Sequence, residues 1–480
     1  MKFIRKIKRK IRHKRRKLIR KYIKRPIKKA IGQYGKDHPA FRRAWKKILY
    51  EKRRFYYWWR AHGVTPDEKT VVFNSFNGKT YGCSPKAVYE YMISHEEFAD
   101  WQFIWAFKNA KKHKFLEQNP NTKVIKQTAR IYERKLAHAK YWITNYRVPD
   151  HVWPKPEQVY VQCWHGTPLK RLGYDLQTSE NAIDSIADIR KKYDVDAQKF
   201  TYILSPSRFA TEKFTSAWNL KESGMEDKVM EVGYPRNDFL LNHKPEDIQK
   251  IKEYIGIPED KKVILYAPTW RDNQHEAGVG FTYDLNVDFE RLRQELGDEY
   301  VILFRVHYLV ASKFSFADFE GFIYNVSNYD DINHLYLIAD LLITDYSSVF
   351  FDYGILRKPM LFYMYDLDGY KDSIRGFYFG IDKLPGRIIT EESELPGAIR
   401  DSIENFVYDE KYREFNEMFS HLEDGQASAR FVATVFPEIQ VTSEVLPREL
   451  ALPEKPEKSE ELEENTEEDS QEAKDDSVQG

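Results

Sequence analysis

Residues 341–349 read LLITDYSSV, and this stretch decides the fold that we expect for the chain. Its short apolar run indicates a buried strand, and Ser347 and Ser348 follow where a helix is expected to begin. The first N–H groups of a helix lack intrahelical partners, and the helix dipole favours negative charge at that end. We therefore interpret the two serines as an anion-binding turn. The alternative is an ordinary helix cap, for which serine is a preferred residue.

Four other apolar runs end in polar turn residues in the same way. Residues 159–164 lead into His165, 202–204 into Ser205, 263–267 into Pro268 and Thr269, and 301–304 into Arg305 and His307. Helix-like stretches, such as 288–296 and 331–339, lie between the runs. Alternating strands and helices predict parallel α/β sheets, in which ligands bind beyond the carboxyl ends of the strands. Because the polar residues fall at such ends, the sequence predicts one shared site.

Each of these residues also has a plainer interpretation. His165 could be a loop histidine with satisfied hydrogen bonds, and His307 could simply end its strand. Cys163 lies near His165, which allows a nucleophile pair, but we expect a buried small hydrophobe because Cys163 falls inside the predicted strand. Arg236 lies in a Gly/Pro turn at 233–238, where an arginine usually faces solvent but could bind a phosphate through two hydrogen bonds.

Together these motifs resemble the CDP-glycerol glycerophosphotransferase family, the teichoic-acid primases and polymerases. The motifs are WHGTPLK at 164–170, GYPRND at 233–238, YAPTWR at 266–271, RVH at 305–307, and TDYSS at 344–348 with Asp352 four residues later. The resemblance runs from about residue 71 to residue 419. One departure is Tyr308, where family members often have proline.

The resemblance implies a GT-B-like architecture, in which two Rossmann-type parallel-sheet domains face each other across a cleft. It also implies a CDP-polyol donor and a lipid-linked acceptor. His165 matches the family's essential histidine. The residues that the resemblance assigns to the donor site are Arg236, Pro268, Thr269, Arg305, His307, Ser347, Ser348 and Asp352.

The predicted reaction transfers glycerol phosphate or ribitol phosphate from a CDP-polyol in teichoic-acid-type polymer synthesis and releases CMP. His165 would act as the general base, since the attacking alcohol must lose a proton near neutral pH, and His307 would stabilise the pyrophosphate. Two alternatives are a GT-B glycosyltransferase that uses a nucleotide sugar and a non-catalytic membrane- or nucleic-acid-binding protein. The sequence has no Cys/His metal cluster, so we expect no metal site and no cofactor.

Charge is strongly segregated along the chain, although the net charge is only +2. Residues 1–60 hold 26 Lys/Arg against two acidic residues, and residues 441–480 hold 14 Asp/Glu against four Lys/Arg. This predicts a basic arm at 1–60, an acceptor domain at 71–240, a CDP-donor domain at 245–420 and a disordered acidic tail at 441–480.

The basic arm has apolar residues at helical spacing and an aromatic cluster at 55–59, which together indicate an anionic membrane surface as partner. Docking of this helix on the first domain is the plainer alternative, and nucleic acid is not the expected partner. No apolar run is long enough to span a bilayer, and the N-terminus does not read as a secretory signal. Cys83 and Cys163 fit a reducing compartment. We therefore expect a peripheral protein on the cytoplasmic face of the cell membrane, of unknown oligomeric state.

Overall fold

We describe the protein from a computed structural model of the 480-residue chain. The structure describes residues 38–177, 185–269, 286–306, 316–367, 376–446 and 449–452, a few single residues before His38, and two short strands between 275 and 281. Of the predicted site residues, His307 lies outside these ranges. The chain forms two compact units, one of residues 1–64 with 149–153 and the other of 65–148 with 154–480.

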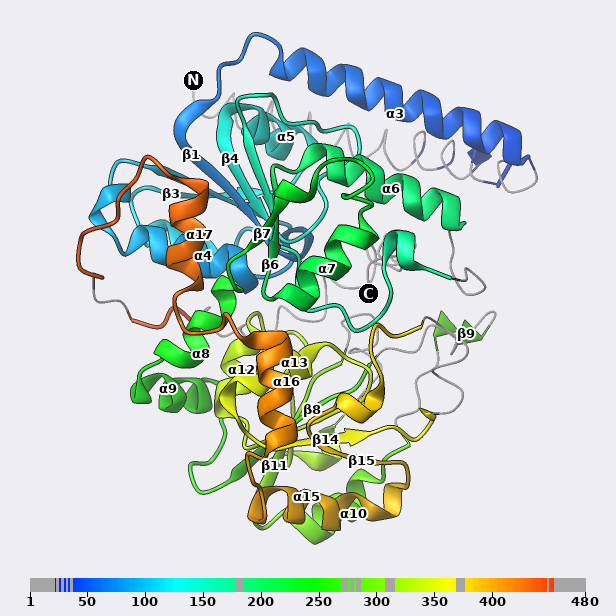
Figure 1. The fold of residues 1–480 in the computed structure, drawn as a ribbon, viewed down its shortest axis with the longest axis vertical. Helices are drawn as coiled ribbons and strands as arrows, with labels where there is room; N and C mark the ends of the chain where they lie inside the picture. The colour runs from blue at the N-terminus through cyan, green and yellow to red at the C-terminus, as the bar shows by residue number, and fades with distance from the viewer. Residues whose placement is uncertain are drawn as a thin grey trace. The chain divides into compact units, whose positions relative to one another are not determined.

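The larger unit contains a first parallel sheet of seven strands in the order β3-β2-β1-β4-β5-β6-β7 (Figure 1). The strands are β1 Asp67–Asn74, β2 Gln102–Phe107, β3 Thr122–Lys126, β4 Ala139–Thr144, β5 Val159–Gln162, β6 Tyr202–Ser205 and β7 Val229–Glu231. The helices between them are α4 Cys83–Ile93, α5 Ala129–His138, α6 Ile186–Lys199 and α7 Arg208–Ala217. We call this sheet and its helices the first lobe. The strand order reverses between β1 and β4, which is the usual ligand position in such sheets.

The second lobe is built on a parallel sheet of six strands in the order β12-β11-β8-β13-β14-β15. These strands are β8 Lys262–Ala267, β11 Tyr300–Phe304, β12 Ile323–Asn325, β13 Leu341–Thr344, β14 Met360–Tyr363 and β15 Arg387–Ile389. Its order reverses between β8 and β13. Beside this sheet, β9 His275–Glu276 and β10 Gly280–Phe281 form a separate antiparallel pair. The two sheets confirm the predicted architecture of two Rossmann-type domains.

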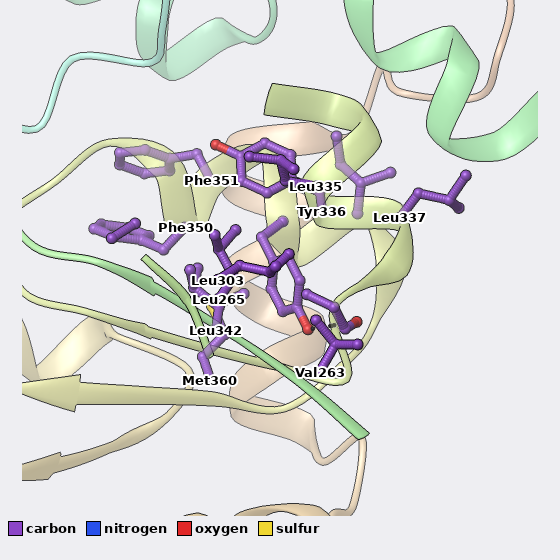
Figure 2. Packing of buried hydrophobic residues seen from close by; sticks show 14 of the residues in the cluster. Val263, Leu265, Leu303, Leu335, Tyr336, Leu337, Leu342, Phe350, Phe351 and Met360 are labelled. Carbon is purple, nitrogen blue, oxygen red and sulfur yellow. Dashed lines mark hydrogen bonds between the residues drawn. The ribbon is translucent and has the colours of Figure 1, made fainter. Parts of the chain in front are cut away.

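Side chains of a strand alternate between the two faces of a sheet. The apolar strands of the second sheet therefore have buried side chains on both faces, and helices cover each face. Val263 and Leu265 pack into one core with α12 Ile332–Ile338, α13 Val349–Tyr353 and α16 Glu410–Ser420. Figure 2 shows this layer, with Leu335, Tyr336, Phe350 and Phe351 above the strand residues. Ile264 and Tyr266 pack into a second core with α10 Phe289–Leu296 and α15 Leu395–Glu404. Burying one such leucine or phenylalanine stabilises the fold by about 1.5–3 kcal/mol.

Helix boundaries follow local capping signals in the sequence. α9 Pro245–Ile255 begins with proline, Asp247 accepts a hydrogen bond from the Lys244 N–H group, and Gly256 ends the helix with φ 91°. The predicted helix at 288–296 is α10, whose cap Asp288 accepts from the Arg291 N–H group. The prediction at 331–339 is α12, which Asp331 caps.

The chain returns to the first lobe after the second sheet, which the sequence did not predict. α17 Ala427–Val435 places Phe431 and Val432 in the core of the first lobe, against residues of β1 and β2. Asp238, at the start of the short helix α8 Asp238–Asn242, accepts hydrogen bonds from the Ala427 and Ser428 N–H groups. The acid therefore satisfies orphan donors at the start of α17.

The smaller unit is dominated by the helix α3 Pro39–Ala61, with the segment 149–153. Within this unit, Tyr57 is buried and its hydroxyl donates to the Trp153 carbonyl. The other four aromatics of the 55–59 cluster are exposed, as are most of the Lys and Arg residues of the helix. Of the predicted basic arm, nearly all residues before His38 lie outside the described ranges.

Candidate functional site

The turns after β8 and β13 meet where the strand order of the second sheet reverses. The two strands pair in register up to Thr344 and Ala267, and the Thr344 hydroxyl donates to the Ala267 carbonyl. Just beyond them, Asp345 Oδ1 accepts from the N–H groups of Thr269, at 2.8 Å, and Tyr346, at 2.6 Å. The buried Asp345 carboxylate therefore holds the Pro268–Thr269 turn against the serine turn. The structure thus brings the turn with Pro268 and Thr269 next to the turn with Ser347 and Ser348, and their binding of the donor stays a prediction.

Ser347 and Ser348 are partly exposed, and their hydroxyls make no hydrogen bond to any residue that the structure describes. Ser348 occupies the position before α13, yet its side chain does not cap the helix. Ser207 provides a contrast within the chain, because its hydroxyl accepts from the Ala210 N–H group and caps α7. The ordinary-cap interpretation therefore applies to Ser207 and fails for Ser348. Two unengaged hydroxyls remain at the end of β13, where a donor phosphate could accept from them.

His165 follows β5, and the next residue, Gly166, lies against the serine turn of the other lobe. Strand β5 ends at Gln162, two residues earlier than predicted. The Gln162 side chain accepts from the Trp164 N–H group, and the backbone of Trp164 takes a left-handed conformation with φ 48°. A Cβ added at Gly166 would lie 3.0 Å from Ser348 Oγ. A Cβ at this position would be in tight contact with the serine hydroxyl, so that Ser348 would have to shift slightly. Next along the chain, residues 169–171 pair with 376–378 of the second lobe.

Cys163 precedes Trp164 and is fully buried. Burial raises the pKa of its thiol well above the usual value, so the reactive thiolate is disfavoured. This agrees with its interpretation as a small hydrophobe.

Arg236 and Asp352, both predicted to bind the donor, form a buried ion pair. Arg236 Nη2 lies 3.0 and 2.8 Å from the two carboxylate oxygens, and Asn237 Nδ2 donates to Asp352 Oδ1 at 3.1 Å. Burial of Arg236 disfavours its charge, but Asp352, together with Cys83 and Tyr234, raises the pKa of the guanidinium well above its usual value. The pair ties the turn after β7 to α13, directly behind the serine turn. Direct donor contact by either residue stays a prediction.

Arg305 ends β11, the neighbour of β8. Its Nη1 donates to the carbonyls of Val326 and Tyr329, each at 2.9 Å, and burial lowers the pKa of the guanidinium. The remaining nitrogens of Arg305 have no hydrogen-bond partner within the described ranges, so half of the guanidinium can still receive a ligand. The position predicted for His307, two residues later, lies outside those ranges.

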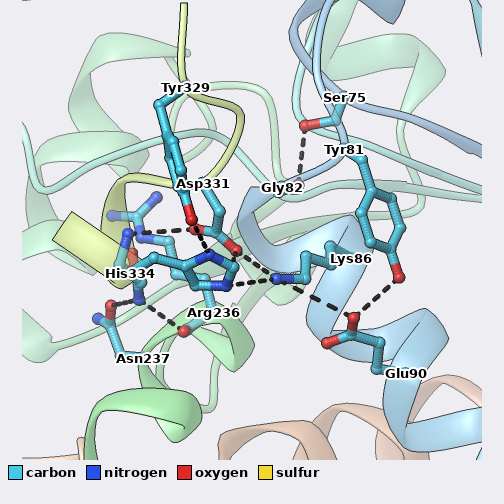
Figure 3. Close-up of polar contacts among 11 residues, drawn as sticks. Ser75, Tyr81, Gly82, Lys86, Glu90, Arg236, Asn237, Tyr329, Asp331 and His334 are labelled. Carbon is cyan, nitrogen blue, oxygen red and sulfur yellow. Dashed lines mark hydrogen bonds and ion pairs between the residues drawn. The ribbon is translucent and has the colours of Figure 1, made fainter. Parts of the chain in front are cut away.

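A polar cluster of Lys86, Tyr329, Asp331 and His334 joins the two lobes (Figure 3). Lys86 Nζ, on α4, donates to Asp331 Oδ2 at 2.6 Å and lies 3.0 Å from His334 Nε2. Burial and then Lys86 lower the pKa of His334 to about 3. The histidine is therefore neutral, accepts from Lys86 at Nε2 and donates from Nδ1 to the Tyr329 hydroxyl. Burial opposes ionisation of Asp331, yet Lys86 lowers the pKa of this carboxyl to about 2.

Sequence reasoning did not identify Asp345 or this interlobe cluster as functional. Asp345 was visible as the acid before the serines, but its role as a backbone clamp depends on the register of β8 against β13. Among the described residues, no group of three or more His, Cys, Asp or Glu side chains could hold a metal ion. Nor does any helix in those ranges have the length and apolar character to cross a membrane.

Residues 57–437 match the family described as CDP-Glycerol:Poly(glycerophosphate) glycerophosphotransferase. The chain belongs to this family. The resemblance found in the motifs is thereby confirmed, and it extends over both lobes of this glycerophosphotransferase-family chain.

Curated relatives of this family chain are teichoic-acid enzymes. The teichoic acid poly(glycerol phosphate) polymerase of Bacillus subtilis (strain 168) is 42% identical over 373 residues, which are 77% of this chain and 48% of the relative. The teichoic acid glycerol-phosphate transferase of Staphylococcus aureus (strain NCTC 8325 / PS 47) is 41% identical over 376 residues, 77% of this chain and 94% of the relative. The chain spans about half the length of the B. subtilis polymerase and of its Staphylococcus epidermidis counterpart.

Solved structures of the wall teichoic acid polymerase TagF share the fold. A histidine-to-asparagine variant soaked with CDPG matches with a TM-score of 0.72 and 37% identity, over 82% of this chain and 96% of that one. A histidine-to-alanine variant gives a TM-score of 0.71.

Proposed function

We propose that this chain transfers glycerol phosphate from CDP-glycerol to a lipid-linked acceptor of teichoic-acid synthesis and releases CMP. The family membership supports the reaction type. Four relatives named as poly(glycerol phosphate) polymerases or as a glycerol-phosphate transferase are 39–42% identical, whereas a glycerol-phosphate primase is 30% identical and the ribitol-phosphate polymerases are 26–37% identical. This difference favours glycerol over ribitol as the polyol.

One observation carries the proposal. His165 of the first lobe and the unengaged hydroxyl of Ser348 of the second lobe are brought together through Gly166. A proton acceptor and a phosphate-binding turn from different sheets are the two groups that phosphoryl transfer to an alcohol needs close together.

In the proposed reaction the acceptor hydroxyl attacks the β-phosphorus of CDP-glycerol. A new bond forms between the acceptor oxygen and the β-phosphorus, and the bond to the oxygen that bridges the two phosphates breaks. CMP leaves with the electron pair of that bond, and the hydroxyl proton passes to His165. Catalysis otherwise depends on positioning and on stabilisation of the developing charge.

The donor site of this proposal lies at the carboxyl ends of β8, β11 and β13. Ser347 and Ser348 donate to phosphate oxygens, and Arg305 supplies positive charge. The remaining members are Pro268, Thr269, Arg236, Asp352 and His307, the last of which stabilises the pyrophosphate. The exposed edge of the serine turn and the half-used guanidinium of Arg305 support this assignment.

Product analysis tests the proposal. Purified protein is incubated with a short-chain lipid-linked acceptor and either CDP-glycerol or CDP-ribitol, and mass spectrometry follows both products. We expect CMP and an acceptor longer by glycerol phosphate, and neither product with the His165→Ala variant. Release of a nucleoside diphosphate from a nucleotide sugar would favour a GT-B glycosyltransferase. Failure to turn over any donor would favour a binding protein.

We also propose that residues 1–60 hold the protein on the anionic cytoplasmic leaflet. The exposed aromatics and basic side chains of α3 support this, since Trp and Tyr favour the interface and each Lys or Arg near it adds roughly 1 kcal/mol. Deleting residues 1–30, which hold 17 Lys/Arg and no acid, should weaken sedimentation with anionic vesicles, and salt should weaken binding of the full chain. Salt-insensitive binding, or tighter binding to RNA, would contradict the proposal.

A further inference from the structure

Phe76 stands out among the aromatic residues of the larger unit. From Thr65 onward it is the only Phe, Tyr or Trp that is exposed, at 37%, among the residues whose burial the structure describes. It directly follows Ser75 at the end of β1, where the strand order of the first sheet reverses. The exposed ring therefore lies at the usual ligand position of the first lobe.

The turn that carries Phe76 is held in an unfavourable backbone conformation. Phe76 has φ 45° and Asn77 has φ 56°, in the left-handed region that bulky side chains rarely adopt. The Phe76 N–H group donates at 2.7 Å to Oδ1 of Asn145, a buried residue directly after β4. Gln127 Nε2 donates to Asn77 Oδ1, and a Cβ at Gly78 would lie 3.0 Å from the Ala106 carbonyl. Strain of this kind persists where the surroundings enforce it and is concentrated at functional sites.

The ring of Phe76 is also a neighbour of the proposed base. Its centroid lies 6.1 Å from that of the His165 ring in an edge-to-face arrangement with an interplanar angle of 61°. His165 thus has an exposed aromatic of the first lobe beside it, while the adjoining Gly166 meets the donor turn of the second lobe. A ring at this position belongs to the acceptor side of the reaction.

We propose that Phe76 forms the acceptor subsite, with its ring packed against the carbon chain of the acceptor's terminal polyol unit. The ring directs the terminal hydroxyl toward His165. The ring face is apolar and carries partial negative charge, so it suits the C–H groups of a polyol and not a phosphate. Asn145 acts as a positioning residue, since it fixes the turn through the Phe76 N–H group. This inference rests on the proposed glycerophosphotransferase function.

The test varies the concentration of a short-chain lipid acceptor that ends in glycerol phosphate, at saturating CDP-glycerol. We compare wild type, Phe76→Ala, Phe76→Tyr and the control Ile131→Ala, which removes a side chain of the same lobe that is 36% exposed on α5. Phe76→Ala should raise the acceptor KM roughly tenfold, a factor that corresponds to about 1.4 kcal/mol. Phe76→Tyr and Ile131→Ala should stay close to wild type. Calorimetry should give the same CDP-glycerol affinity for all four proteins.

An unchanged acceptor KM in Phe76→Ala would overturn the inference. So would a loss of CDP-glycerol affinity as large as the change in acceptor KM, because the ring would then serve the donor. Calorimetric titration of the acceptor alone decides the matter independently of turnover, since Phe76→Ala should weaken that binding by the same factor. If wild type released no CMP, the proposed function would fail, while the acceptor titration would still test Phe76.

Discussion

Separating the structural and donor-binding roles of Arg236 requires variants of both members of its ion pair. The guanidinium and the Asp352 carboxylate are only 5% and 10% exposed, and the closest N–O distance is 2.8 Å. At an effective dielectric constant of 20, two unit charges 4 Å apart attract by about 4 kcal/mol. Removing one partner leaves the other charge buried and uncompensated, which typically destabilises a protein by about 3–5 kcal/mol.

We therefore expect Arg236→Met and Asp352→Asn each to lower the free energy of unfolding by about 3–5 kcal/mol. The double variant should be more stable than either single variant, because neither charge is then left alone. Its asparagine also keeps an oxygen that can accept from Asn237 Nδ2, which now donates to Asp352. Urea unfolding at pH 7, followed by tryptophan fluorescence, measures all four proteins, and the cycle gives the coupling energy.

Calorimetric titration with CDP-glycerol on the same four proteins then separates the two roles. If Arg236 also binds a donor phosphate, as the family motif predicts, the double variant recovers stability but stays at least about tenfold weaker for the donor, the loss of one charge-assisted hydrogen bond. Full recovery of donor affinity in the double variant would remove both Arg236 and Asp352 from the donor site. A double variant no more stable than the single variants would refute the reasoning about the buried pair.

Three further predictions follow from the site and the lobe connection. His165→Ala should lower kcat about 10²–10⁴-fold with unchanged CDP-glycerol affinity, and a variant that keeps more than about a tenth of wild-type kcat would exclude the general-base role. Ser348→Ala should weaken CDP-glycerol binding by about 1–3 kcal/mol. Gly166→Ala should also weaken this binding, because the added methyl group displaces Ser348. The control Ser207→Ala should lower stability without changing the affinity for CDP-glycerol. Glu423, between α16 and α17, accepts a hydrogen bond from the Tyr234 N–H group of the turn after β7. Burial raises the pKa of Glu423 from 4.5 to about 8, so the folded state retains a proton that the unfolded state has lost between these values. Stability should fall as the pH rises from about 4.5 to 8, and Glu423→Gln should flatten this dependence in urea unfolding at pH 5 to 8.5; parallel curves for the two proteins would contradict the assignment.

The strands and their polar ends could be predicted because the signals are local. An apolar run followed by a turn residue marked β5, β8, β11 and β13, and the ends of β8 and β13 then met through strand pairing alone. The motif at 344–348 predicts which of these ends binds the donor. What escaped prediction depends on contacts between distant parts of the chain. Arg236 and Asp352 are 116 residues apart. Each motif by itself predicts a residue that binds the donor, and neither indicates that the two side chains pair with each other. No local pattern in α17 indicates that it packs on the first lobe.

The serine turn itself shows why a local interpretation could not decide between cap and ligand site. Ser207 and Ser348 both stand at the start of a helix, and residue preference alone would make both of them caps. At the end of β13, however, the Ser348 side chain does not cap α13, and Asp345 Oδ1 accepts from the N–H groups of Tyr346 and, across the strand pair, of Thr269. The Ser348 hydroxyl remains available on the side that faces Gly166.

The distance between the two lobes is also set by contacts between residues far apart in the sequence. His165 can serve a donor bound at Ser348 only if the lobes keep their register to within about an ångström, because misplacement of that size can reduce a rate about 100-fold. Lys86 and Asp331 place opposite charges across the lobes, and the neutral His334 accepts a further hydrogen bond from Lys86. A charged pair without those bonds would be costly to bury. Gly166 adds the steric limit, because any side chain there would meet Ser348. The interlobe cluster and the glycine therefore constrain, from two sides, the distance between the lobes across which the proposed reaction would move its proton and phosphoryl group.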